Sequence, residues 1–257
     1  MYHLVQNFFI FSEYHVPPCA KLFMYNESYE HIIGAFTSNN NKDDKVLAVS
    51  PVAGEKIIIE YFEPYFSDFI GSLVISKVSH DFLDILNTKE NGVKASGSCN
   101  VDANCPEGNN WQKEKRSVCR ILINGSGLCT GSLINNTSND GRAYFLTANH
   151  CISSQQIASA SIFYFNYEKN SCNSGSGSLS QSISGATLRA TRANSDFTLL
   201  ELSKKPLSTY RPFFAGWDRN NTQNEGGVGI HHPSGDVKKI STYTMIPQST
   251  SYLSNVI

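Results

Sequence analysis

Two short segments far apart in the sequence carry side chains suited to hydrolytic chemistry. His150 and Cys151 follow an apolar run that ends at Leu146, and Asp196 opens a second apolar run. An aspartate that accepts a hydrogen bond from one imidazole nitrogen fixes the tautomer of the ring and stabilises the imidazolium. The imidazole can then take the proton of a serine nucleophile and return it to a leaving amine. The alternative interpretation is a structural histidine and an aspartate that merely begins a strand.

The cysteines favour a disulfide framework. Six of the seven fall between Cys99 and Cys172, which is typical of a protein from an oxidising compartment. The segment around Cys129 should form the strand next to the one that leads to Cys151, so Cys129 is the natural partner of Cys151. No C-x-x-C pair is present, which argues against a structural zinc site. The odd number leaves at least one cysteine without an internal partner.

Composition excludes several classes of function. A net charge of −1 and a pI near 6.6 give no electrostatic reason to expect binding to nucleic acid or to an anionic membrane. No stretch reaches the roughly 20 apolar residues of a membrane span. The apolar segment Phe8–Phe11 lacks the flanks of a signal peptide. Because the cysteines nevertheless indicate a secreted protein, we expect that the natural chain begins before Met1.

The chain divides into two regions of different character. Residues 1–86 contain one cysteine and several runs rich in β-branched and aromatic residues, so they predict a small β-rich domain. The polar stretch 87–98 has almost nothing to bury and is the predicted linker. Residues 99–257 form the second region. The predicted strands are 21–25, 32–36, 56–62, 71–75, 117–123, 128–134, 143–146, 161–167, 187–193, 197–202, 213–216 and 228–231.

Turn residues separate these runs, with predicted breaks at 38–44 and at Pro51. A short helix is predicted only at Ser153–Ser159. Many short strands with Gly and Asn turns indicate an all-β sandwich or barrel.

From Ser98 onward the chain resembles lysyl endopeptidase, a bacterial serine protease with the chymotrypsin fold. The segments that carry the resemblance run in order over nearly the whole second region. They are Ser98–Asn100, Asn104–Gly108, Cys129–Leu133, Tyr144–Ala148, His150–Cys151, Ser195–Leu202, Ala215–Arg219 and Ile230–Pro233.

The resemblance implies a trypsin-like double β-barrel, with His150 as the general base and Asp196 as its orienting carboxylate. It implies the disulfides Cys129–Cys151 and Cys105–Cys172, and it pairs Cys99 with a cysteine beyond the end of this chain. It offers no partner for Cys119.

The resemblance also gives the first region a role. Residues 21–86 look like the pro-domain of such proteases, so residues 1–86 are predicted to be a pro-domain that lacks its N-terminal part. An enzyme that cuts after lysine could mature itself in the linker, and we expect cleavage after Lys94. The alternative interpretation is that Lys89 and Lys94 are two ordinary solvated lysines.

No serine of this sequence is a credible nucleophile. Ser126 precedes His150, which is the wrong order for the family, and is expected in a hairpin turn. Ser234 lacks the preceding glycine that helps to form the oxyanion hole, and a turn is expected there too. We therefore expect a fragment that ends before its nucleophile, with an incomplete second barrel and no activity alone. Selectivity for lysine rests on the resemblance.

Three functions stay open at this stage. The favoured one is a fragment of a secreted serine endopeptidase precursor that acts on proteins or peptides, as a monomer and without a cofactor or metal. The second is a protease-like binding protein that has lost catalysis. The third is a zinc hydrolase that uses His150, His231 and His232, although adjacent residues on a strand point to opposite faces.

Overall fold

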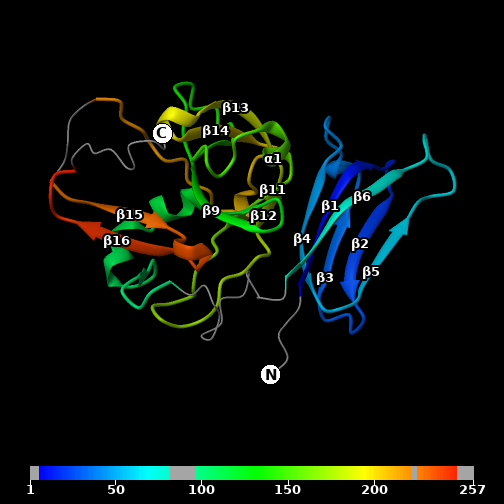
Figure 1. Ribbon diagram of the computed structural model, residues 1–257, viewed down its shortest axis with the longest axis horizontal. Coiled ribbons are helices and arrows are strands. Elements are labelled where there is room, and N and C mark those ends of the chain that lie inside the picture. The colour runs from blue at the N-terminus through cyan, green and yellow to red at the C-terminus, as the bar shows by residue number, and fades with distance from the viewer. Residues whose placement is uncertain (1–5, 82–95, 221–224, 248–257) are drawn as a thin grey trace.

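The computed structural model describes residues 6–81, 96–220 and 225–247. Nearly all of its regular structure is β-strand, arranged as two parts that lie side by side (Figure 1). One α-helix, α1 (Gln155–Ser159), is present among these residues, close to the predicted 153–159. The 3₁₀ turns are η1 (Ser38–Asn40), η2 (Pro106–Trp111), η3 (Glu114–Ser117), η4 (Ala193–Ser195), η5 (Ser208–Tyr210) and η6 (Pro233–Gly235).

The first part is a sandwich of two three-stranded antiparallel sheets. The strand orders are β4-β1-β6 and β3-β2-β5. Side chains from both sheets form one core that includes Phe11, Tyr14, Leu22 and Val49. The strands are β1 (Gln6–His15), β2 (Lys21–Asn26), β3 (Ile32–Phe36), β4 (Leu47–Ala53), β5 (Ile57–Phe62) and β6 (Ser72–Asp81).

The sequence analysis was wrong about Pro51 and did not assign β1 or β4. Pro51 lies inside β4 instead of breaking the chain. The register passes from Val49 opposite Phe9 to Val52 opposite Asn7, which leaves an irregularity at Pro51. A proline cannot donate a ladder hydrogen bond, and such a bulge is where a strand tolerates one. The apolar run at Phe8–Phe11 is the buried middle of the sheet.

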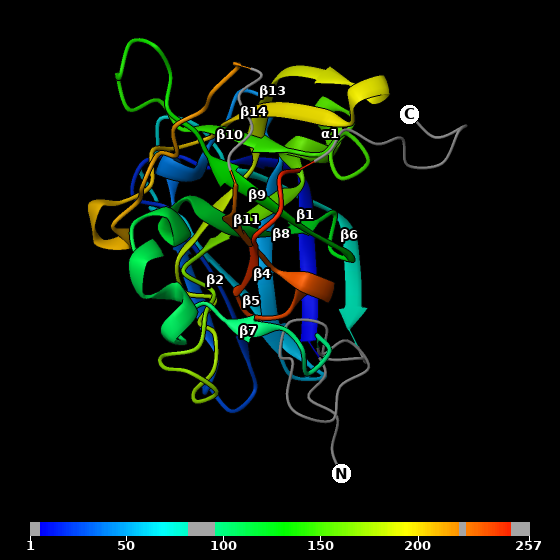
Figure 2. The same cartoon turned by 90° about the vertical axis from the view of Figure 1, so that its left-hand side faces the viewer.

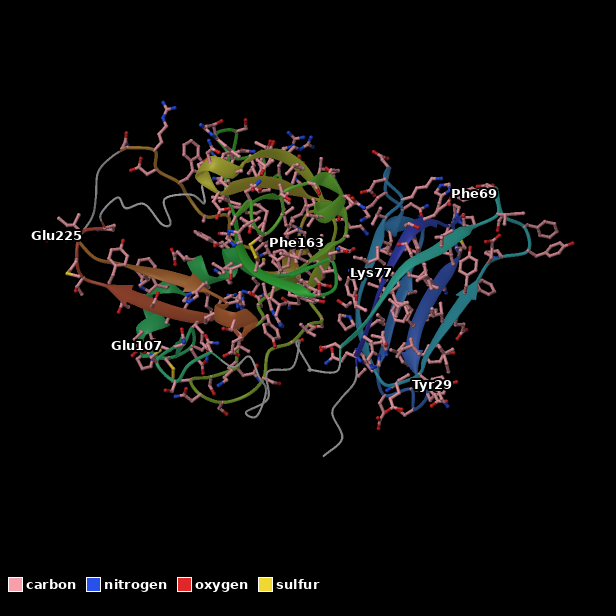
Figure 3. All side chains as sticks on the ribbon, in the orientation of Figure 1. Tyr29, Phe69, Lys77, Glu107, Phe163 and Glu225 are labelled. Atoms are coloured by element: carbon pink, nitrogen blue, oxygen red, sulfur yellow. A yellow bond between two sulfur atoms is a disulfide. The ribbon has the colours of Figure 1, made fainter. Side chains whose placement is uncertain are left out.

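The second part is built on a curled seven-stranded antiparallel sheet in the order β12-β11-β8-β9-β10-β14-β13. Its concave side encloses a core in which Phe145 and Phe163 meet edge to face, and Figure 3 shows Phe163 inside this part. The strands are β8 (Val118–Ile123), β9 (Gly127–Leu133), β10 (Tyr144–Thr147), β11 (Ser161–Phe165), β12 (Ser182–Ser184), β13 (Ala186–Arg192) and β14 (Phe197–Leu202).

A fourth sheet, of three strands, completes the described structure. It has the order β15-β16-β7, with β7 (Val101–Asp102), β15 (Gly227–His231) and β16 (Lys239–Tyr243). The predicted strand 213–216 is reduced to a single bridge between Ile134 and Ala215. The curled sheet and the small fourth sheet confirm the predicted all-β, trypsin-like fold with an incomplete second barrel.

The sandwich packs against the convex face of the curled sheet. A buried apolar cluster joins Phe8, Ile10 and Ala48 of the sandwich to Leu122, Ile162 and Tyr164 of β8 and β11. The Ser50 and Tyr164 hydroxyls lie 2.9 Å apart, and the Ala48 N–H donates to the Ser184 hydroxyl. Two views at right angles show the sandwich on the same side of the curled sheet (Figures 1 and 2). Lys77, labelled in Figure 3 where the two parts meet, donates to the Asn124 carbonyl.

Candidate functional site

The pairing of two strands brings His150 and Asp196 together. β10 and β14 are antiparallel neighbours, with Thr147 opposite Thr198. Continued beyond these two residues, the same register places His150 next to the turn that carries Asp196. Each functional side chain therefore stands just outside the end of a strand at one edge of the barrel.

Asp196 receives two hydrogen bonds from His150. One carboxylate oxygen accepts from the His150 backbone N–H at 2.9 Å, and the other lies 2.6 Å from imidazole Nδ1. These bonds, first the backbone N–H and then the ring, hold the pKa of the Asp196 carboxyl below its usual value. An ionised carboxylate on Nδ1 keeps a proton there, and this leaves Nε2 free to act as a base.

The backbone conformation of Asp196 aims its carboxylate. Asp196 ends η4 in the left-handed region, with φ 44° and ψ 44°. Aspartate tolerates this conformation better than most residues. The chain therefore turns sharply between η4 and β14, and the side chain meets both the backbone and the ring of His150.

Several contacts fix the loop that carries His150. The disulfide Cys129–Cys151 joins it to β9, and the Thr147 hydroxyl donates to the Thr130 carbonyl at 2.9 Å. On the other side of His150, the Ile152 carbonyl accepts a 2.7 Å hydrogen bond from the buried Thr198 hydroxyl. The chain is therefore held in place both before and after His150.

Sequence reasoning missed these supporting residues. Thr198 and Thr191 have their hydroxyls 2.6 Å apart, and the Asn149 side chain donates to Thr191. A threonine in a strand is ordinary, so neither residue type nor spacing could distinguish these three. Only the alternation of β14, which turns Thr198 inward, hints at a role.

His150 is open to solvent. Its side chain is 71% exposed and that of Asp196 50% exposed. Among the described residues, no serine hydroxyl is hydrogen-bonded to Nε2 of His150. Ser126 lies in the turn between β8 and β9, and Ser234 lies in η6 between β15 and β16.

The structure does not gather the histidines into one metal site. Within the described ranges, the one group of potential metal ligands comprises Cys129, His150 and Cys151. Both sulfurs of that group are bonded to each other and cannot act as thiolate ligands. His232 is fully buried, with its Nδ1 on the Asp236 carbonyl, so its ring belongs to the packing under η6.

The remaining cysteines occupy three different environments. Cys105 and Cys172 form the second disulfide, which joins the start of η2 to the loop after β11. Cys99 and Cys19 are exposed thiols in the described structure, whereas Cys119 is buried. Burial raises the pKa of the Cys119 thiol to about 12, which makes it an inert part of the core. Lys94 lies outside the described residues.

Comparison with known proteins identifies the group to which this arrangement belongs. The model of the lysyl endopeptidase C-terminal domain matches residues 93–256. The chain belongs to the lysyl endopeptidase family. The lysyl endopeptidase of Pseudomonas aeruginosa strain PAO1 is 34% identical to it over an alignment of 164 residues that covers 58% of this chain and 35% of the relative. The chain thus spans about a third of the length of that relative.

Membership of the lysyl endopeptidase family confirms the predicted resemblance. The matched residues 93–256 include His150, Asp196 and the four disulfide-bonded cysteines. Among the described residues, no helix is long and apolar enough to cross a membrane.

Proposed function

We propose that this chain is part of the precursor of a secreted serine endopeptidase that cleaves after lysine. His150 is the general base, Asp196 orients it, and a serine from residues that this sequence does not include is the nucleophile. The observation that carries the proposal is the 2.6 Å contact between Nδ1 of His150 and the Asp196 carboxylate at an exposed barrel edge. Family membership supports the reaction class, and selectivity for lysine rests on the relative's name.

The geometry supports the two steps that need a base. The His150 side chain is 71% exposed, so its Nε2 can take the proton of a serine that attacks the scissile carbonyl. The imidazolium that forms is stabilised by the Asp196 carboxylate and returns the proton to the leaving amine. Neither step requires Asp196 to become protonated, which agrees with its lowered pKa.

We propose that residues 1–86 are the pro-domain, 87–98 the linker and 99–257 the protease domain. The sandwich packs on β8 and β11 and leaves the His150 side chain 71% exposed. The described part of the first region, residues 6–81, therefore does not cover His150. Maturation by cleavage after Lys94 is tested by intact-mass analysis of secreted material. A mature start remote from Ala95 contradicts this cleavage site.

The decisive experiment begins with the DNA that follows codon 257. A frame that continues to a Gly-x-Ser-Gly segment supports the proposal, whereas a stop codon there favours a protease-like binding protein. The protein encoded by the complete frame should hydrolyse a lysyl p-nitroanilide substrate. His150→Ala should lower kcat about 10⁶-fold, and Asp196→Asn about 10⁴-fold.

Two controls separate this chemistry from metal-dependent hydrolysis. His231→Asn and treatment with EDTA should both leave the rate unchanged, because neither touches the proposed base. Loss of activity in either control contradicts the serine mechanism and favours the zinc alternative, in which His231 is a ligand.

A further inference from the structure

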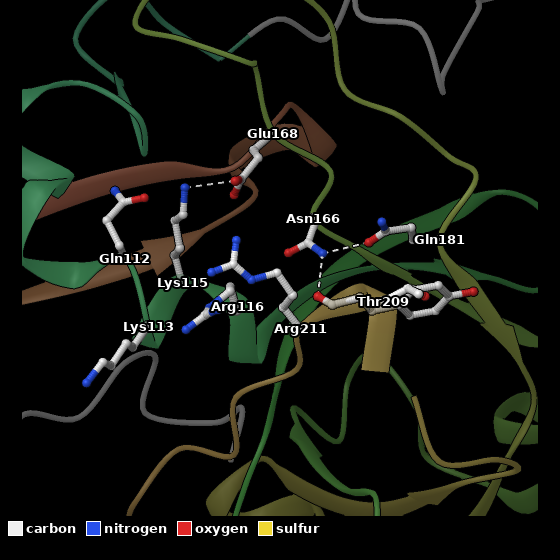
Figure 4. A pocket seen from close by; sticks show the side chains of 10 residues that line it. Gln112, Lys113, Lys115, Arg116, Asn166, Glu168, Gln181, Thr209 and Arg211 are labelled. Carbon is white, nitrogen blue, oxygen red and sulfur yellow. Dashed lines mark hydrogen bonds and ion pairs between the residues drawn. The ribbon is translucent and has the colours of Figure 1, made fainter. Parts of the chain in front are cut away.

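A second concave site lies on the protease part, apart from His150 and Asp196. Its volume is about 460 Å³, within the usual range for small-ligand sites. Residues of η3, of the loop after β11 and of η5 surround it, as the close-up shows (Figure 4). The ten that line it are Gln112, Lys113, Lys115, Arg116, Asn166, Glu168, Gln181, Thr209, Tyr210 and Arg211.

The charges in this pocket do not balance. Four lining side chains are cationic and one, Glu168, is acidic. Glu168 is already engaged, because Lys115 lies 2.8 Å from one of its oxygens and the buried Lys238 lies 3.3 Å from the other. Lys113, Arg116 and Arg211 form no ion pair with any residue in the described part of the chain. Three cations therefore share one cavity without a counter-charge.

Arg116 is the part-buried guanidinium of the pocket. Its Nε is buried and has no hydrogen-bond partner in the described structure. A buried polar group that lacks a partner is unfavourable, and more so when it is charged. Arg211 places a second guanidinium at the same pocket, from a backbone held in the left-handed region at φ 51°.

The neutral lining groups are fixed in place. The Asn166 amide donates to Gln181 at 2.6 Å and to the Tyr210 carbonyl at 2.8 Å, drawn as dashed lines in Figure 4. These bonds join the loop after β11 to η5, and Arg211 directly follows η5. This side of the pocket is therefore held in place before a ligand binds, which lowers the cost of binding.

We propose that this pocket binds a tetrahedral oxyanion, phosphate or sulfate, free or as a monoester. Planar guanidinium groups match the oxygens of such anions with paired N–H donors. A dianion neutralises three unpaired cations better than a single carboxylate does. Phosphate carries about −1.5 to −2 at pH 7, so it suits this site better than acetate or chloride.

The test is thermal unfolding of the full chain at pH 7.5 in sodium chloride, acetate, sulfate or phosphate at equal ionic strength. A ligand that binds only the native state raises Tm saturably with its concentration. We expect this rise with sulfate and phosphate and not with acetate. O-phosphoserine forms a further arm, and a larger rise with it than with inorganic phosphate identifies a monoester as the ligand.

Two variants and one matched control make the test specific to the pocket. Arg211→Gln removes an exposed guanidinium and Arg116→Gln the part-buried one, and each should weaken phosphate binding roughly tenfold or more. Arg219→Gln removes an exposed arginine outside the pocket and should respond to phosphate like the unmodified chain. The proposal is overturned if Arg211→Gln and Arg219→Gln give the same phosphate response, or if acetate stabilises as strongly as phosphate.

Discussion

At the scale of single residues, Asp196 is the group on which the site depends. It accepts hydrogen bonds from both the backbone and the ring of His150. The same two bonds that orient the imidazole also hold the His150 loop against the start of β14. Asp196 should therefore matter for stability as well as for chemistry, and the two effects have different signatures.

The stabilising effect of Asp196 should depend on pH. Because its pKa is lowered in the folded protein, its contribution is present above the unfolded pKa, near 3.9, and is lost as the pH falls through the folded pKa. We expect Asp196→Asn to be less stable than the unmodified chain at pH 6 in urea unfolding. The difference should shrink steadily towards pH 2.

Asp43→Asn serves as the control, because Asp43 is exposed on the loop before β4. Its stability difference from the unmodified chain should stay constant over the same pH range. A constant difference for Asp196→Asn would show that its carboxylate is not held by His150 in solution.

At the scale of elements, a buried ion pair stabilises the small sheet β15-β16-β7. Asp102, on β7, is 1% exposed and lies 2.5 Å from Lys239 of β16. Burial raises the pKa of Asp102, but hydrogen bonds from Lys239 and the Asn173 backbone outweigh it and keep the pKa below its usual value. The carboxylate is therefore ionised inside the protein and joins two strands distant in sequence.

Removing one partner of this buried pair should be costly. Asp102→Asn removes the nearer of two carboxylates beside the buried Lys239 ammonium and leaves Asp236 at 3.6 Å; breaking such a buried pair destabilises a protein by about 3–5 kcal/mol. Urea unfolding at pH 7 measures the loss. The exposed pair Lys56–Glu27 provides the comparison, since Glu27→Gln should cost less than about 1 kcal/mol. Equal losses would contradict the structural role of Asp102.

The two disulfides should contribute unequally. They join residues 22 and 67 positions apart, and a longer closed loop restricts the unfolded chain more. Replacing both cysteines by Ala should cost about 3 kcal/mol for Cys129–Cys151 and about 4 kcal/mol for Cys105–Cys172. Urea unfolding of the two double variants gives the comparison, and the reverse order would contradict this loop-entropy argument.

At the scale of the whole molecule, one apolar interface holds the sandwich against the curled sheet. Ala48, 1% exposed, packs in the cluster that contains Ile162 and Tyr164. This cluster buries side chains of β8 and β11 that point away from the core of the barrel. The outer face of β8 and β11 is therefore covered by the sandwich, residues 6–81, and not by solvent.

A charge in this interface should weaken both parts together. Ala48→Glu buries a carboxylate among apolar groups and should cost about 3 kcal/mol or more. Hydrogen exchange should show lost protection in β11 as well as in β4. Ile59→Glu, at a position 39% exposed on β5, should cost less than about 1 kcal/mol. Unchanged protection of β11 in Ala48→Glu would contradict this packing.

Local patterns in the sequence were sufficient to predict the residues of the site and the strands that carry them. The runs that end at Leu146 and begin at Phe197 are strands because alternating and β-branched residues suit a half-buried sheet. The residue types of His150 and Asp196 likewise indicate their proposed chemistry. Their pairing could be predicted only through the family resemblance, because the register of β10 on β14 depends on contacts between distant segments.

Tertiary structure alone decided three features. Pro51 sits inside a strand because its partner β1 leaves an irregularity there, which no local rule reveals. The interface around Ala48 depends on which face of the sandwich meets which face of the barrel. The cationic pocket joins Arg116 to Arg211, each of which looks like an ordinary solvated residue in sequence. Short-range preferences determine the strands, whereas the free energy of packing distant surfaces determines what the strands bring together.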